Sequence, residues 1–175
     1  FDGVDIDWEF PGGGGANESL GSPQDGDGFV ALMKDLRTAL DALSKQTGRS
    51  YQLTAAVSGG VEKLRKINWE AAHPYLDYIN LMTYDYYGAW NGTLGHMTGV
   101  NPNPNSPIAG FSTREAVEHI LARQVPASKV TIGAAMYGRG WKTVNNVQNG
   151  NPFSGTGGEG IAGSWEKGIE DYKKI

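Results

Sequence analysis

The chain contains no cysteine, and it has only three histidines among its 175 residues. The absence of cysteine excludes disulfides, a thiolate nucleophile and cysteine-ligated zinc. The histidines stand at positions 73, 96 and 119, and this wide separation does not match the ligand spacing of a metal site. We therefore expect a protein that works without a metal and without a cofactor.

Long apolar stretches are also missing, because no run approaches the ~20 residues that a membrane-spanning helix requires. The net charge is −4 at pH 7, which disfavours a polyanionic partner such as nucleic acid. The glycine-rich residues 12–15 lack the Lys-Ser/Thr pair of a phosphate-binding loop, and they do not have dinucleotide-binding spacing. We expect no membrane and no nucleic acid among the partners, and we expect a monomer.

The chain opens with Phe1 inside a predicted strand rather than with methionine. We interpret it as an internal fragment of a longer protein, so the missing signal peptide says nothing about localisation. Glycine is abundant, with 26 residues, and there are 5 Trp and 8 Tyr. Aromatic faces can stack on the apolar faces of sugar rings, although most Trp and Tyr in any protein pack in the core.

Acidic and apolar side chains alternate near the start of the chain. In a β-strand alternate side chains share a face, so Asp5, Asp7 and Glu9 lie on one face, about 6.5–7 Å apart along the strand. The apolar residues between them lie on the other face. The simpler interpretation is a solvent-exposed strand on which the three acids fall by chance. However, three like charges on an interior strand cost free energy of folding, so they are not expected there unless function requires them.

Such a row of acids suits proton transfer. Neighbouring carboxylates do not all ionise together, and a carboxyl that stays neutral near pH 6–7 can protonate a leaving-group oxygen. Glu9 stands at the end of the predicted strand and is the natural proton donor. Asp7 can accept a hydrogen bond or turn toward a substrate, and Asp5 can hold the proton that Asp7 releases.

Strand and helix signals alternate along the chain, which is typical of an α/β protein. Apolar spacing predicts helices near 26–46 and 60–74, and a capping box at 112–115 opens a helix to about 124. Strands are predicted over 2–10, 51–58, 78–84 and 129–136. Strands separated by helical sequence predict a parallel sheet with right-handed crossovers.

Three motifs, in order along the chain, resemble the signatures of family 18 glycoside hydrolases, the chitinases. The acid row reads D-x-x-D-x-D-x-E from Asp2 to Glu9. Residues 82–90, MTYDYYGAW, are similar to the sixth-strand motif of that family, and residues 135–141, AMYGRGW, are similar to its seventh-strand motif. The resemblance covers the whole chain and is strongest to bacterial chitinases of the chitinase A type.

The resemblance implies a (β/α)8 TIM barrel, which needs about 250 residues. We expect residues 1–141 to form part of that catalytic barrel, roughly strands four to seven. After Trp141 the α/β rhythm breaks, and residues 142–175 resemble the beginning of the α+β insertion domain of chitinase A-type enzymes. The resemblance also implies a secreted, extracellular protein.

The family's chemistry is retaining hydrolysis of β-1,4-linked N-acetylglucosamine, in which the substrate's own acetamido oxygen attacks the anomeric carbon and forms an oxazolinium ion. By this resemblance Glu9 protonates the glycosidic oxygen and then activates water. Asp7 would bond the acetamido N–H, and Asp5 would modulate Asp7. Tyr84 would donate its hydroxyl to the acetamido oxygen.

The resemblance also implies substrate-binding residues. Asp85 and Arg139 would bond sugar hydroxyls, and Met82 would lie beneath the acetamido methyl. The remaining candidates for contact with the sugar chain are Trp90, Phe111, Tyr137, Trp165 and Glu166, with Trp141 a weaker one. In barrel enzymes the catalytic residues lie at the C-terminal ends of the strands. This rule selects many of the same residues that the resemblance implies.

Structural interpretations stand beside these roles. Tyr84 and Asp85 could simply end a strand, Arg139 could be an ordinary salt-bridge partner, and Met82 could be core. We assign Trp8 and Trp69 to the core.

Two other functions remain open at this stage. A lectin on the same scaffold would typically lack the terminal glutamate, and Glu9 is present. An endo-β-N-acetylglucosaminidase shares the acid motif, but the later motifs favour chitin.

Overall fold

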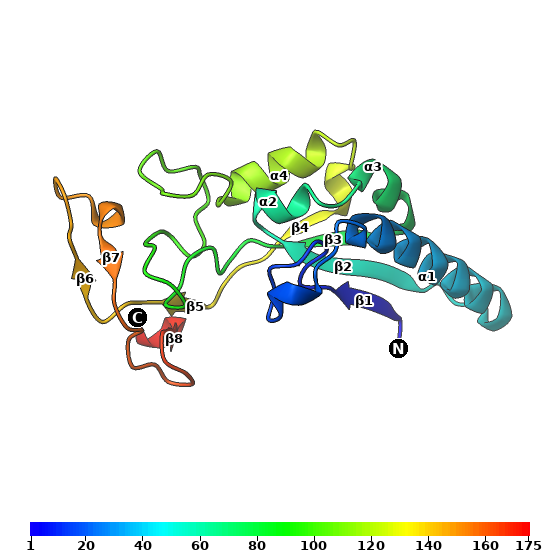
Figure 1. The fold of residues 1–175 in the computed structure, drawn as a ribbon. Helices are drawn as coiled ribbons and strands as arrows, with labels where there is room; N and C mark the ends of the chain where they lie inside the picture. Colours follow the sequence, from blue (N-terminus) through cyan, green and yellow to red (C-terminus); the bar gives the residue numbers. More distant parts are fainter. The chain divides into compact units, whose positions relative to one another are not determined.

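Four strands form a parallel sheet in the order β1-β2-β3-β4 (Figure 1). They are β1 (Gly3–Asp7), β2 (Gln52–Ser58), β3 (Tyr78–Met82) and β4 (Val130–Ile132). The computed structural model describes residues 1–175, with the side chain of Glu18 left out. The prediction of an α/β chain with a parallel sheet is confirmed.

Helices fill the connections between these strands. They are α1 (Asp25–Thr47), α2 (Val61–Leu64), α3 (Trp69–Ala72) and α4 (Thr113–Leu121), with short 3-10 turns η1 (Glu18–Leu20), η2 (His73–Tyr75), η3 (Ala127–Lys129), η4 (Pro152–Ser154) and η5 (Tyr172–Lys174). α1 ends at Thr47 and is followed by Gly48, which adopts φ 70° and donates its N–H to Ser44 O at 2.9 Å. This left-handed glycine is the helix end that the sequence predicts.

The helical region predicted over 60–74 forms two short helices instead of one. The side chain of Asn68 accepts a hydrogen bond from Ala71 N at 3.2 Å and so caps the start of α3. Asn prefers this N-cap position to the interior of a helix. The segment therefore turns at Asn68, and both short helices contribute buried side chains to the core: Leu64 from α2, and Trp69 and Ala72 from α3.

α4 begins where the capping box is predicted. Ser112 Oγ accepts from Glu115 N at 3.3 Å and donates to Glu115 Oε2 at 2.6 Å, while Gly110 N donates to Glu115 Oε1 at 3.0 Å. The side chains of Ser112 and Glu115 thus accept hydrogen bonds from backbone N–H groups at the start of the helix, where the N–H groups have no partner within the helix.

The chain divides into two compact units. The first unit contains residues 1–82 and 116–132, and the second contains residues 83–115 and 133–175. The core of the first unit lies between the sheet and its helices: Leu53, Ala55 and Val57 on β2 and Ile79 and Leu81 on β3 are buried. Their alternation with less buried residues leaves the opposite face of the sheet polar.

The two tryptophans assigned to the core are found there. Trp69 is fully buried and donates its Nε1–H to Leu64 O at 2.8 Å. Its ring lies edge-on to Phe29 at 6.0 Å, and Trp8 packs against the same ring at 6.5 Å. Full burial of each large apolar side chain contributes about 1.5–3 kcal/mol to folding.

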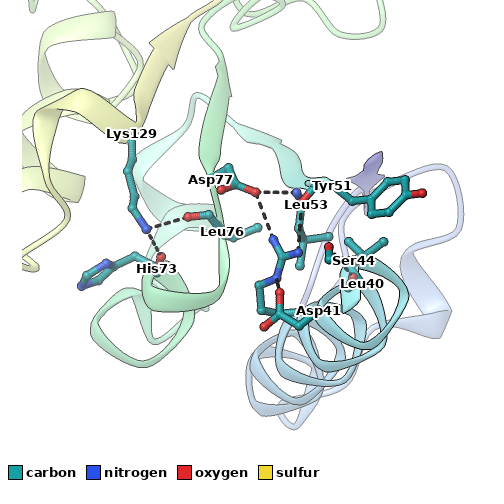
Figure 2. A network of polar contacts seen from close by, with 10 residues as sticks. Leu40, Asp41, Ser44, Tyr51, Leu53, His73, Leu76, Asp77 and Lys129 are labelled. Carbon is teal, nitrogen blue, oxygen red and sulfur yellow. Dashed lines mark hydrogen bonds and ion pairs between the residues drawn. The ribbon is translucent and has the colours of Figure 1, made fainter. Parts of the chain in front are cut away.

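A network of polar contacts joins the N-terminal ends of the strands to the helices (Figure 2). Asp77 Oδ2 accepts from Leu53 N at 2.7 Å and from Arg37 Nη1 at 3.2 Å, and Arg37 Nη2 donates to Tyr51 O at 3.0 Å. Lys129 Nζ donates to the carbonyls of His73 and Leu76 at 2.9 and 2.6 Å. In α/β proteins the N-terminal ends of parallel strands usually contribute to stability, so we interpret the network as stabilising.

The second unit is built from short antiparallel pairs. β5 (Tyr137–Arg139) pairs with β8 (Ile169–Asp171), and β6 (Val144–Asn145) pairs with β7 (Thr156–Gly157). The strand predicted over 129–136 therefore stops at Ile132. Residues 137–139 form a separate strand because their backbone groups find partners in β8.

α1 is the longest helix, with 23 residues. None of the helices in the described part of the chain combines the length and the apolar character needed to cross a membrane.

Candidate functional site

The acid row occupies the polar face and the end of β1. Val4 and Ile6 pack against the core, whereas Asp5 and Asp7 are exposed on the other face. The alternation predicted for this strand is confirmed, but the strand ends at Asp7 rather than at residue 10. Glu9 is exposed and lies two residues beyond the C-terminal end of β1. Because these carboxyl groups are exposed, they can exchange protons with solvent or with a bound ligand.

A row of polar side chains crosses the sheet on the face of Asp5. Asp5 Oδ1 accepts hydrogen bonds from Thr54 Oγ1 and from Asn80 Nδ2, the second at 3.3 Å. Asn80 Oδ1 accepts from Thr131 Oγ1 at 2.6 Å. We call Asp5, Thr54, Asn80 and Thr131 the polar row; it takes one residue from each strand of the sheet.

Sequence reasoning missed the partners of Asp5. Thr54 and Asn80 alternate with buried aliphatic residues on their strands, so period-2 spacing could have placed both on the polar face. Their pairing with Asp5 depends on the register Asp5↔Thr54 and Ala56↔Asn80. Local pattern does not carry that register, because the strands are far apart along the chain.

The glycine-rich segment after Glu9 approaches the backbone of the acid row closely. A Cβ atom at Gly15 would lie 2.0 Å from Glu9 O, so a larger residue there would displace the backbone of Glu9. Lys63 Nζ donates to Gly13 O at 2.8 Å and ties the segment to α2. The segment thus serves as packing for the end of β1, which is consistent with the absence of a phosphate-loop motif.

Asp85 and Arg139 form a two-point ion pair in the second unit. Arg139 Nε donates to Asp85 Oδ1 at 2.5 Å and Nη2 donates to Oδ2 at 3.0 Å. The hydrogen bonds with Asp85 raise the pKa of Arg139 against the opposing effect of burial. Asp85 adopts φ 56°, which turns the chain sharply at this carboxylate. Arg139 thus does have a salt-bridge partner, and the bidentate pair holds its guanidinium in a fixed orientation.

Aromatic rings surround this pair. The Arg139 guanidinium lies 4.7 Å from the ring centre of Trp90 and 5.8 Å from that of Tyr137, both within cation–π range. Tyr84 meets Tyr137 edge-on at 6.4 Å. Burial first, and then the hydrogen bond and charge of Asp85, raise the pKa of Tyr137 above its ordinary value.

A cleft of about 470 Å³ lies beside the same cluster in the second unit. It is lined by Trp90, Arg139 and Glu166, with the Glu159–Lys167 ion pair also at its wall. Three residues predicted from sequence to contact substrate thus line one cleft. A neighbouring cleft of about 740 Å³ includes Trp165, Glu166 and Glu159.

The remaining predicted residues have different surroundings. Trp165 is 79% exposed and donates its Nε1–H to Asp171 Oδ1 at 3.0 Å. Phe111 packs between Tyr86, at 5.4 Å, and Tyr87, at 5.5 Å. Burial raises the pKa of Tyr86 to about 12. Phe111 thus packs against two tyrosine rings, whereas the ring of Trp165 is exposed.

Met82 and Trp141 complete the set. Met82 is the last residue of β3 and is half-buried, pairing in register with Ser58. Trp141 donates its Nε1–H to Asn91 O at 3.2 Å and is half-buried. Over the residues that the structure describes, no group of His, Cys, Asp and Glu side chains has the arrangement of a metal site.

Comparison with known proteins places the chain. The family model for glycosyl hydrolases family 18 matches residues 1–175. The chain is 44% identical over 202 residues to a chitinase A of Pseudoalteromonas piscicida, and 49% identical over 179 residues to a chitinase of Autographa californica nuclear polyhedrosis virus. All of this chain is covered in both comparisons, but only 24% and 32% of the respective relatives.

A solved structure agrees with the sequence comparison. The chain is similar to the catalytic domain of psychrophilic chitinase B from Arthrobacter TAD20, with a TM-score of 0.88 and 32% sequence identity. The match covers 100% of this chain and 41% of that one. The resemblance inferred from the three motifs is thereby confirmed. The chain belongs to family 18 of the glycosyl hydrolases.

Proposed function

We propose that the protein is a chitinase, which hydrolyses the β-1,4 linkages between the N-acetylglucosamine units of chitin. The observation that carries the proposal is the row of exposed acids on and just beyond β1, in a family 18 chain whose relatives are named chitinases. Acids at the C-terminal end of a parallel strand are typical of active sites in α/β enzymes.

The proposed chemistry assigns a separate task to each acid. Glu9 protonates the glycosidic oxygen while the substrate's acetamido oxygen attacks the anomeric carbon, and then, as a carboxylate, Glu9 takes a proton from the incoming water. Asp7 accepts a hydrogen bond from the acetamido N–H and stabilises the positive oxazolinium ion. Asp5 takes up the proton that Asp7 releases. Tyr84 donates its hydroxyl to the acetamido oxygen.

Sugar hydroxyls are the proposed ligands of Asp85 and Arg139. Their mutual ion pair supports this role, because it presents both groups in a fixed geometry and leaves further donors on the guanidinium. Trp90 is 57% exposed beside Arg139 and offers a ring face for stacking. We extend the proposal to the other predicted contacts, namely Met82, Phe111, Tyr137, Trp165 and Glu166.

The proposal includes the finer features of the architecture. Residues 1–141 would be part of the catalytic (β/α)8 barrel and residues 142–175 the beginning of an α+β insertion domain. The parallel order of β1 to β4 supports the first assignment, and the antiparallel pair of β6 and β7, which lies wholly after residue 141, supports the second. We also propose a secreted monomer that binds chitin oligosaccharides.

The experiment is hydrolysis of chitin oligosaccharides by the intact protein, followed by nuclear magnetic resonance of the first product. Substrate assistance predicts that the first product is the β-anomer. For a chitinase we also expect the release of N,N′-diacetylchitobiose. Substrate assistance also predicts that fully deacetylated oligosaccharides are cleaved at least about 10²-fold more slowly, because the internal nucleophile is absent. Initial α-anomer, or equal cleavage of both substrates, would contradict the mechanism.

The same assay separates the alternative functions. Cleavage of glycoprotein glycans without cleavage of chitin oligosaccharides would identify an endo-β-N-acetylglucosaminidase. Binding of chitin oligosaccharides with no turnover would identify a lectin.

A further inference from the structure

The polar row is continuous from one edge strand of the sheet to the other. Thr131 on β4 donates to Asn80 on β3, and Asn80 and Thr54 both donate to a single oxygen, Oδ1, of Asp5 on β1. Asp5 and Thr131 are exposed, and Asn80 and Thr54 are half-buried. The row lies on the face of the sheet opposite the apolar core of the first unit.

The direction of each hydrogen bond fixes the orientation of the next group. With the Thr131 hydroxyl donating to Asn80 Oδ1, the amide of Asn80 presents its Nδ2–H groups toward Asp5. Asp5 Oδ1 then receives two donors and serves as an acceptor. A proton arriving on Asp5 consequently goes to Oδ2, because a proton on Oδ1 would compete with both donors.

We propose that Asn80 is a positioning residue for proton transfer between Asp7 and Asp5, with its amide oriented by Thr131. The inference rests on the proposed function. In the step concerned, the O–H bond of neutral Asp7 breaks and a new O–H bond forms at Oδ2 of ionised Asp5, which leaves Asp7 as the carboxylate. Asn80 and Thr54 both donate to Oδ1, so they hold the Asp5 carboxylate in one orientation and leave Oδ2 to receive this proton.

The test compares pH profiles of the intact protein and its variants on chitin tetrasaccharide. Asn80→Leu keeps the approximate volume of the side chain and removes the donor. We expect kcat to fall about tenfold with KM nearly unchanged, since a hydrogen bond to a charged group is lost at a residue that need not touch substrate. The acidic limb of the kcat profile should move to higher pH, because a carboxylate that loses a hydrogen-bond donor binds a proton more readily.

Thr131 provides a second, independent pair of variants at an exposed position. Thr131→Val removes the hydroxyl and should move the acidic limb in the same direction by a smaller amount. Thr131→Ser keeps the hydroxyl and should restore the parental profile. Gln52→Leu, on the same face of β2 but outside the polar row, is the matched control and should leave the profile unchanged.

The possible outcomes distinguish failure of the positioning role of Asn80 from failure of the proposed function. If the parental protein cleaves the tetrasaccharide but Asn80→Leu and Thr131→Val both keep its kcat and acidic limb, the positioning role is wrong and the proposed function stands. Equal loss in Thr131→Ser and Thr131→Val would also overturn the role. If the parental protein does not cleave the substrate, the proposed function fails first.

Discussion

At the scale of single residues, Arg139 illustrates how one side chain can combine several interactions. It makes two hydrogen bonds to Asp85 and places its flat guanidinium near the ring of Trp90. The Arg139 side chain is 16% exposed and that of Asp85 is 35% exposed, so the pair is partly shielded from water. Lysine carries the same charge but cannot form the planar two-point contact.

We therefore predict that Arg139→Lys raises KM for chitin oligosaccharides by about tenfold, because the pair with Asp85 loses its fixed orientation. Steady-state kinetics of the intact protein would measure this. Arg49→Lys is the matched control, since Arg49 pairs with Asp2 and lies over Tyr51 but is 58% exposed. Parental KM in Arg139→Lys would show that the two-point geometry has no part in binding.

The residue scale also shows what the sequence could predict. Strand alternation placed Asp5 and Asp7 on one face correctly, because the period of a strand is a local property. The contact of Asp5 with Asn80 joins residues that are 75 positions apart. It depends on how three strands align, and no local pattern of the sequence contains that alignment.

At the scale of elements, the end of β1 depends on the glycine-rich segment that follows it. Gly15 lies so close to Glu9 O that only a hydrogen fits in place of a side chain. α1 and the capping box before α4 were predictable, because caps and apolar spacing are local signals. β5 could not be predicted in this way, because its residues 137–139 form a strand only by pairing with β8. That strand follows about 30 residues later, and its own sequence gives no strand signal.

Two glycine variants test the dependence of Glu9 on its neighbouring segment. Gly15→Ala would place a Cβ 2.0 Å from Glu9 O, so we expect kcat on chitin oligosaccharides to fall at least about tenfold as the backbone of Glu9 shifts. Gly28→Ala is the control. Its Cβ would meet Trp8 at 3.9 Å, so this helical position should keep full activity and gain about 0.4–1 kcal/mol of stability.

Activity and thermal unfolding of both variants would be compared with those of the parent. Unchanged turnover in Gly15→Ala would mean that the segment does not control the position of Glu9.

At the scale of the whole molecule, the chain consists of two compact units, and each contains some of the residues predicted from the sequence. The acids of β1 and the polar row belong to the first unit, and the Asp85–Arg139 pair with its aromatic surroundings belongs to the second. The three motifs that revealed the family are short, but they occur in the family's order, and the family model extends over residues 1–175. Order along the chain was thus as informative as any single motif.

The measurement that tests the central claim most directly is turnover of chitin oligosaccharides by the Glu9→Gln variant of the intact protein. Glutamine keeps the shape of the side chain but can neither donate the acid's proton nor act as a base, so we predict that kcat falls by about 10²–10⁴-fold while the Kd for the oligosaccharide stays nearly parental. Glu118→Gln, at an exposed position on α4, should keep parental turnover. Near-parental turnover in Glu9→Gln would contradict the account.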